Sequence, residues 1–157
     1  MSDTVYQASD LSGSKRTEFI NEARKGIARL RTPDGTSLVM LPENRLDVLE
    51  AVARWGAAHV RLSGLLRRSP AALTTADLGE LAWLRSLDRD DIEEFLSELQ
   101  DAVVAASADE DTTVLEECIR AWRTTARQLA DPLRRHILLG SHRSEDYVDA
   151  EPPHDQG

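Results

Sequence analysis

Residues 26–42 read GIARLRTPDGTSLVMLP, and this stretch decides the fold. Polar and apolar side chains alternate over residues 27–31, which is the pattern of a half-exposed strand. The Pro-Asp-Gly sequence at 33–35 favours a tight turn, because proline presets φ and glycine accepts a positive φ. Residues 36–42 are apolar enough for a buried strand, and Pro42 would end it because proline cannot donate to the ladder. The stretch therefore predicts a β-hairpin.

A strand and a helix are expected before the hairpin. Residues 5–8 (VYQA) are a short strand candidate, and Ser9 or Asp10 then offers a side-chain oxygen to cap a following helix. Small polar residues weaken the first turn of that helix, so we expect firm helix from about Lys15. Gly26 is well suited to end it.

After the hairpin the apolar residues follow helical spacing. One helix is predicted from about Leu46, continuing beyond Gly56 until Ser69-Pro70 breaks it. We expect its apolar stripe to be buried, as is usual for an amphipathic helix. This stripe consists of Leu46, Leu49, Val52, Ala53, Val60, Leu62, Leu65 and Leu66.

Three further helical segments are expected. Thr74 or Thr75 can cap a helix that contains Leu78, Leu81, Trp83, Leu84 and Leu87. Asp88 can cap the next one, with acids in its first turn as the helix dipole favours and with a stripe formed by Ile92, Phe95, Leu96, Leu99 and Val103. A polar joint at 107–111 then precedes a helix over about 114–129, and Pro132 opens a last turn. The pattern as a whole predicts an α+β fold, with a small strand-helix-hairpin-helix unit in front of a mainly helical region.

The charge is distributed unevenly along the chain. The 157 residues carry a net charge of −9, which argues against nucleic acid as a partner of the whole surface. Residues 1–45, however, have a balance of +1, whereas the rest of the chain has a balance of −10. A DNA-facing surface in the first part therefore stays possible.

The composition excludes several classes of protein. With one cysteine, Cys118, there is no internal disulfide framework, and no Cys/His spacing suggests zinc. The chain shows neither a secretion signal nor an apolar run of the roughly 20 residues that span a bilayer, so we expect a cytoplasmic protein that binds no membrane. Phosphate loops, nucleophile elbows and paired-histidine helices are missing, so we predict no enzyme, no catalytic residue and no small-molecule substrate.

Two groups of residues are candidates for a site. The acids Asp88, Asp90, Asp91, Glu93 and Glu94 lack the spacing and the turn glycine of a calcium loop, and capping explains them, so no metal or cofactor is expected. The tryptophans Trp55, Trp83 and Trp122 lie on helical stripes, where they would be core or interface anchors.

The order of elements resembles that of the prevent-host-death (Phd/YefM) antitoxins. Residues 6–11 (YQASDL) resemble the opening of that family, 18–26 (EFINEARKG) its first helix, 28–42 its hairpin, and 43–46 (ENRL) the start of its next helix. The resemblance covers about the first 55 residues. The family often has an Ala-Arg pair after the first strand, where this chain has Ser-Asp at 9–10.

The resemblance implies a function and a division into domains. Residues 1–55 would dimerise and bind operator DNA, residues 56–142 would bind a cognate toxin, and residues 143–157 would be a disordered acidic tail. Candidate DNA contacts are Lys15, Arg16, Arg29 and Arg31, and candidate partner contacts are Trp83, Phe95 and Trp122. The protein would then be an antitoxin that neutralises its toxin by direct binding and represses its own operon. Two alternatives stay open, namely a DNA-binding regulator or oligomerising adaptor without a toxin, and an enzyme whose site the sequence does not reveal.

Overall fold

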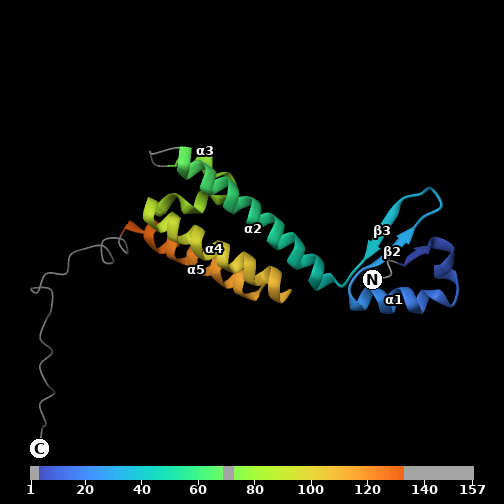
Figure 1. Ribbon diagram of the computed structural model, residues 1–157. Helices are drawn as coiled ribbons and strands as arrows, with labels where there is room; N and C mark the ends of the chain where they lie inside the picture. The colour runs from blue at the N-terminus through green and yellow to red at the C-terminus, as the bar shows by residue number, and fades with distance from the viewer. Residues whose placement is uncertain (1–3, 69–72, 133–157) are drawn as a thin grey trace, which may run out of the picture.

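The computed structural model describes residues 4–68 and 73–132 as an α+β protein that is mostly helical (Figure 1). Its sheet has three strands in the order β1-β2-β3. β1 (Val5–Gln7) runs parallel to β2 (Ala28–Arg31), and β2 runs antiparallel to β3 (Ser37–Met40). The hairpin predicted from the sequence is therefore confirmed.

The turn of the hairpin is formed as the Pro-Asp-Gly sequence predicts. Gly35 has φ of 87°, a conformation that L side chains rarely adopt. The carboxylate of Asp34 accepts hydrogen bonds from the backbone N–H of Thr36 at 3.1 Å, from the Thr36 hydroxyl at 3.0 Å and from the Thr32 hydroxyl. These bonds, the Thr32 hydroxyl first, lower the pKa of Asp34 because they favour the charged carboxylate.

Helix α1 (Lys15–Lys25) covers one face of the sheet and forms a small core with it (Figure 1). Phe19 and Ala23 of the helix pack against Tyr6 and Ala28 of the strands, and the Tyr6 and Phe19 rings meet edge to face at 5.3 Å. Gly26 ends the helix as predicted.

The start of this region differs from the prediction in one respect. A 3-10 helix, η1 (Ala8–Ser12), follows β1 directly, and α1 begins only at Lys15. Asp10 lies inside η1, where its carboxylate accepts the backbone N–H of Gln7 at 2.9 Å. This carboxylate thus caps the 3-10 turn, and α1 is left without a side-chain cap.

The prediction that residues 36–42 form a buried strand is wrong. Every residue of β3 is exposed, with Leu38 at 48%, Val39 at 55% and Met40 at 44%. The physical reason is position, because β3 is the edge strand and the small core contains residues of α1, β1 and β2. An apolar strand sequence predicts that its side chains will be buried, but it does not identify the element that buries them.

A single long helix leads into the second part of the molecule. α2 (Glu43–Arg68) begins right after Pro42 and runs without a break past Gly56, as predicted. The domain boundary proposed at residues 55 and 56 falls inside this helix. One cluster of buried residues ends at Leu30 and the other begins at Ala51, inside α2.

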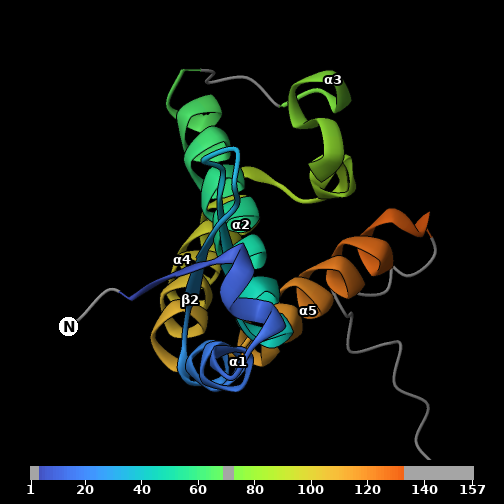
Figure 2. The same ribbon diagram turned by 90° about the vertical axis from the view of Figure 1, so that its right-hand side faces the viewer.

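The second cluster is the core of a helical body, which consists of α2, α4 (Arg89–Asp109), α5 (Thr113–Ala130) and the short segments between α2 and α4 (Figures 1 and 2). α4 packs against both α2 and α5. Asp88 caps α4 as predicted, because its carboxylate accepts the backbone N–H of Asp91 at 2.9 Å. The largest fully buried side chains among the described residues all lie in this body, and they are Phe95, Leu62, Leu78, Leu84, Leu99 and Leu115.

The single helix predicted after Thr74 or Thr75 is replaced by two short ones. α3 (Thr75–Leu78) is capped by Thr74 and is followed by a 3-10 helix, η2 (Gly79–Ser86). The break occurs at Gly79, whose φ of 57° lies outside the right-handed helical region. Leu81 and Leu84 are nevertheless buried, so the apolar pattern predicted burial correctly and the helix type wrongly.

The remaining predictions concern the polar joint, the end of the chain and membrane insertion. α4 extends to Asp109, and the left-handed residue Glu110 ends it. The turn predicted after Pro132 and the tail over 143–157 lie outside the described residues. Among the described residues, no helix combines the length and the apolar character that a membrane span requires.

Candidate functional site

The sheet presents one open face, and two of the four candidate DNA contacts lie on it. Ala28 and Leu30 face α1, so Arg29 and Arg31, which alternate with them along β2, project from the opposite face. Both arginines are exposed. Their neighbours in the register are Val5 and Val39 beside Arg29, and Gln7 and Ser37 beside Arg31.

The other two candidates lie at the start of α1, on the side of the sheet that this helix covers. Lys15 Nζ is 3.4 Å from Asp10 Oδ1, and Arg16 is exposed. A cation at a helix N-terminus faces the positive end of the helix dipole, and Asp10 offsets this here. The four cations therefore lie in two separate pairs, on different sides of the N-terminal unit (residues 4–42). They do not form a single basic patch.

The three aromatic residues predicted to bind a partner belong to the core of the helical body. Phe95 is fully buried and Trp122 is 9% exposed, and only Trp83 is half-buried. The Phe95 ring meets Trp83 at 5.4 Å and Trp122 at 5.7 Å, both edge to face. Trp122 Nε1 donates a hydrogen bond to Glu98 at 2.6 Å. Phe95 and Trp122 thus stabilise the body and offer no surface to another molecule in this fold.

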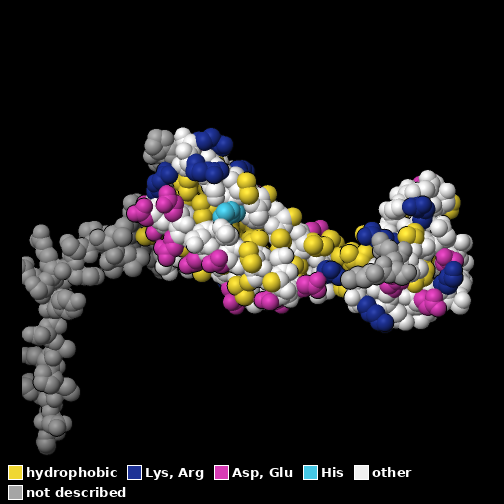
Figure 3. Space-filling model, viewed as in Figure 1, with side chains coloured by type: hydrophobic (Ala, Val, Ile, Leu, Met, Phe, Trp, Pro, Cys, Tyr) yellow, Lys and Arg dark blue, Asp and Glu magenta, His cyan; other side chains and the backbone are white. Residues whose placement is uncertain are grey.

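Large exposed apolar side chains concentrate in the first third of the chain. Of the ten that the described residues expose by more than 40%, seven lie between residues 5 and 49. In Figure 3, hydrophobic side chains gather where the hairpin runs into α2. We call these seven residues the apolar strip, namely Val5, Ile27, Leu38, Val39, Met40, Leu46 and Leu49. The expected burial of the α2 stripe is wrong in this chain for Leu46 and Leu49, and also for Val60, which is 69% exposed.

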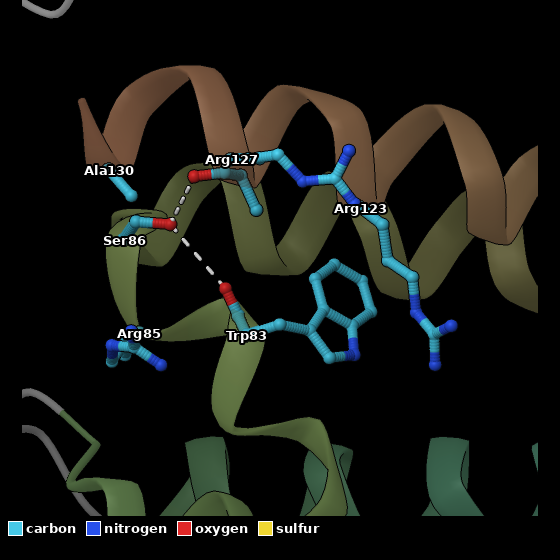
Figure 4. A pocket seen from close by; sticks show the side chains of 7 residues that line it. Trp83, Arg85, Ser86, Arg123, Arg127 and Ala130 are labelled. Atoms are coloured by element: carbon cyan, nitrogen blue, oxygen red, sulfur yellow. Dashed lines mark hydrogen bonds between the residues drawn. The ribbon is translucent and has the colours of Figure 1, made fainter.

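A second feature, which sequence reasoning missed, lies on the helical body. Two hollows of about 450 and 340 Å³ adjoin along α5, and Arg123 and Arg127 line both. Arg54, Trp55 and Arg120 line the first hollow, and Trp83 and Arg85 line the second (Figure 4). We call this feature the arginine groove. The signal in the sequence is the spacing of Arg120, Arg123 and Arg127, which places them on one helix face within a region whose net charge is acidic.

Two titratable groups have raised pKa values. The pKa of Tyr6 is raised to about 12, first by the hydrogen bond between its hydroxyl and Glu22 and second by burial. Burial, together with the charge of Glu98, raises the pKa of the Cys118 thiol. Such a thiol is mostly protonated and poorly nucleophilic at neutral pH. Within residues 4–68 and 73–132, no group of three or more metal-ligating side chains comes together.

Comparison with known proteins adds no relative. No known protein family, curated protein or solved structure matches this chain. The features of this chain that bear on its function are therefore the apolar strip, the two pairs of cations and the helical body.

Proposed function

We propose that this chain is a non-catalytic antitoxin of the prevent-host-death type, which dimerises through its N-terminal unit and binds DNA as a dimer. Three features support this proposal. The elements follow each other in the expected order of strand, helix, hairpin and long helix. The hairpin and the start of α2 expose the apolar strip, and the sheet carries two arginines on its open face.

The apolar strip is the single observation that supports the proposal most strongly. Scattered exposed apolar side chains need no explanation, but a concentration of them marks an interaction surface. β3 is also an edge strand, with apolar side chains and no proline or lysine to block pairing. A second copy of the chain that pairs along the edge of β3 would cover Leu38 and Met40, which lie on the face of the sheet opposite to Arg29.

Pairing also gives the DNA contacts a purpose. A two-fold dimer doubles every cationic pair, and it matches the two-fold symmetry of a palindromic operator. Lys15 and Arg16 form one pair in each copy, and Arg29 and Arg31 form the other. Phosphate contacts from these side chains would give binding that weakens steeply with salt.

The DNA contacts can be tested by gel shift with the DNA upstream of the chain's own reading frame, at several salt concentrations. Changing Arg29 and Arg31 together to Gln removes four cations from a dimer, so it should weaken binding and reduce the salt slope by about 3.6, since each phosphate contact contributes about 0.9. The Lys15→Gln, Arg16→Gln double variant should behave alike. Wild-type protein that does not bind this DNA at low salt would refute the proposal of an autorepressor.

A second candidate function is a DNA-binding regulator or oligomerising adaptor that has no toxin. One observation favours it, because the helical body has a core of its own centred on Phe95. An antitoxin segment that folds only around its toxin would not need such a core. Co-expression with the product of the adjacent reading frame separates the two candidates. Co-purification of the two proteins supports the antitoxin, whereas a chain that binds DNA but purifies alone supports the regulator.

A further inference from the structure

The arginine groove is a concentration of positive charge on an acidic protein. Five arginines line its two hollows, and among the described residues Glu116 is the carboxylate that lines the first hollow with them. The chain as a whole has a net charge of −9. The local charge along this face of α5 is positive, although the chain is acidic. Like charges at helical spacing repel each other, so the cluster of arginines costs stability unless an anion binds to it.

The three arginines of α5 in the groove have no carboxylate partner among the described residues. Among the described residues, no carboxylate oxygen lies within 4.0 Å of a guanidinium nitrogen of Arg120, Arg123 or Arg127. Arg54 pairs with Glu80 at 3.3 Å, at one side of the groove, and Arg85 donates to the carbonyl oxygen of Ala82 at 3.2 Å. Within residues 4–68 and 73–132, these three adjacent guanidinium groups of α5 are therefore left without a carboxylate and can take an anion.

Aromatic rings lie beside these cations in both hollows. Arg54 lies 5.5 Å from the centre of the Trp55 ring, and Arg123 lies 5.7 Å from that of Trp83. Figure 4 shows the indole of Trp83 next to the Arg123 side chain. The Nε1–H of Trp83 is buried and has no acceptor among the described residues. A hydrogen-bond acceptor on a bound molecule could satisfy this donor, since Arg123 itself can only donate.

We propose that the arginine groove binds a nucleotide. Guanidinium groups match phosphate oxygens in a forked, bidentate geometry, so Arg120, Arg123 and Arg127 would hold the phosphates. The flat indole of Trp55 or Trp83 would pack against the base, because every base has a face that stacks on aromatic rings. The hollows, at about 450 and 340 Å³, have the size of ordinary small-molecule sites, which is roughly 300 to 1,000 Å³. This inference is independent of whether the N-terminal unit binds DNA.

The test is a titration of the full chain with ATP, inorganic tripolyphosphate and adenosine, each followed by tryptophan fluorescence and by calorimetry. We expect ATP to bind at least tenfold more tightly than tripolyphosphate, and adenosine to bind more weakly than either. Equal affinity for ATP and tripolyphosphate would overturn the nucleotide assignment, because the base would then contribute nothing. No binding of ATP or tripolyphosphate would overturn the site itself.

Matched variants locate the binding on the protein. The Arg120→Gln, Arg123→Gln double variant should lose at least a hundredfold in affinity for ATP. The control is the Arg67→Gln, Arg68→Gln double variant, which removes the same charge from the exposed end of α2 and should change affinity less than twofold. An equal loss in both would mean that ATP responds to overall charge, and this would contradict the proposal. Thermal unfolding followed by circular dichroism checks that both variants are folded.

Discussion

Replacing Phe95 by leucine should destabilise the helical body while keeping its core filled. The Phe95 side chain is completely buried, and its ring meets two other rings edge to face, at 5.4 Å for Trp83 and 5.7 Å for Trp122. Each such pair contributes about 0.5–1.5 kcal/mol beyond the burial of its area. Losing both should therefore cost about 1–3 kcal/mol. For a body of this size, that lowers Tm by about 4 to 24 °C, taking about 4–8 °C per kcal/mol. Alanine would also leave a cavity, for a total of about 3–5 kcal/mol.

The assay is thermal unfolding followed by tryptophan fluorescence. All three tryptophans lie in α2, η2 and α5, so this signal reports on the helical body and not on the sheet. The control is Val104→Ala on the same helix, at a side chain that is 61% exposed, where we expect a change within about 0.5 kcal/mol. If the Phe95→Leu shift does not exceed the Val104→Ala shift, the three rings do not form the centre of this core.

Asp88→Ala removes the side-chain cap of α4 and should lower the free energy of unfolding by about 1 kcal/mol in urea titrations, and a loss near zero would show that the cap is not formed. The pKa of Tyr6 is raised to about 12 in the folded chain, from its ordinary value of 10.0. The protonated hydroxyl should therefore add its full contribution to the free energy of unfolding below pH 10, and this contribution should be lost as the pH rises towards 12. Absorbance titration in a Tyr147→Phe background should show this pKa, and Glu22→Gln should lower it; an unchanged value in Glu22→Gln would exclude the hydrogen bond as its main cause. Cys118 should react slowly with a thiol reagent in the native protein and quickly in urea, and rapid native labelling would contradict its burial.

Much of the fold could be predicted from residue types and their spacing. The Pro-Asp-Gly turn at 33–35, the end of α1 at Gly26 and the cap at Asp88 each depend on a local chemical preference, and each was predicted correctly. The break at Gly79 was missed, since Leu78, Leu81 and Leu84 are spaced as in one continuous helix. A glycine inside such a pattern can be tolerated or can end the helix, and packing decides between the two.

The surfaces were harder to predict than the elements. The apolar pattern of β3 and of the first turns of α2 predicts that these side chains are buried. It does not say whether they are buried by another element of the same chain or by a second chain. In the structure Leu38 and Leu49 are left exposed, and only three-dimensional placement reveals this. The arginine groove combines residues of α2, η2 and α5, so no single stretch of sequence could indicate it. Charges that sum to an acidic region along the chain can still gather into a basic surface after folding.

The proposed pairing of two chains is tested most directly by light scattering coupled to size-exclusion chromatography at several protein concentrations. The wild-type protein should have twice the chain mass of 17.4 kDa, and Leu38→Glu, which introduces a charge into the apolar strip, should have the mass of one chain. Val104→Glu makes the same kind of change at an exposed valine of α4 and should leave the dimer intact. A wild-type protein that stays monomeric at every concentration, or a Leu38→Glu variant that stays dimeric, would contradict this account.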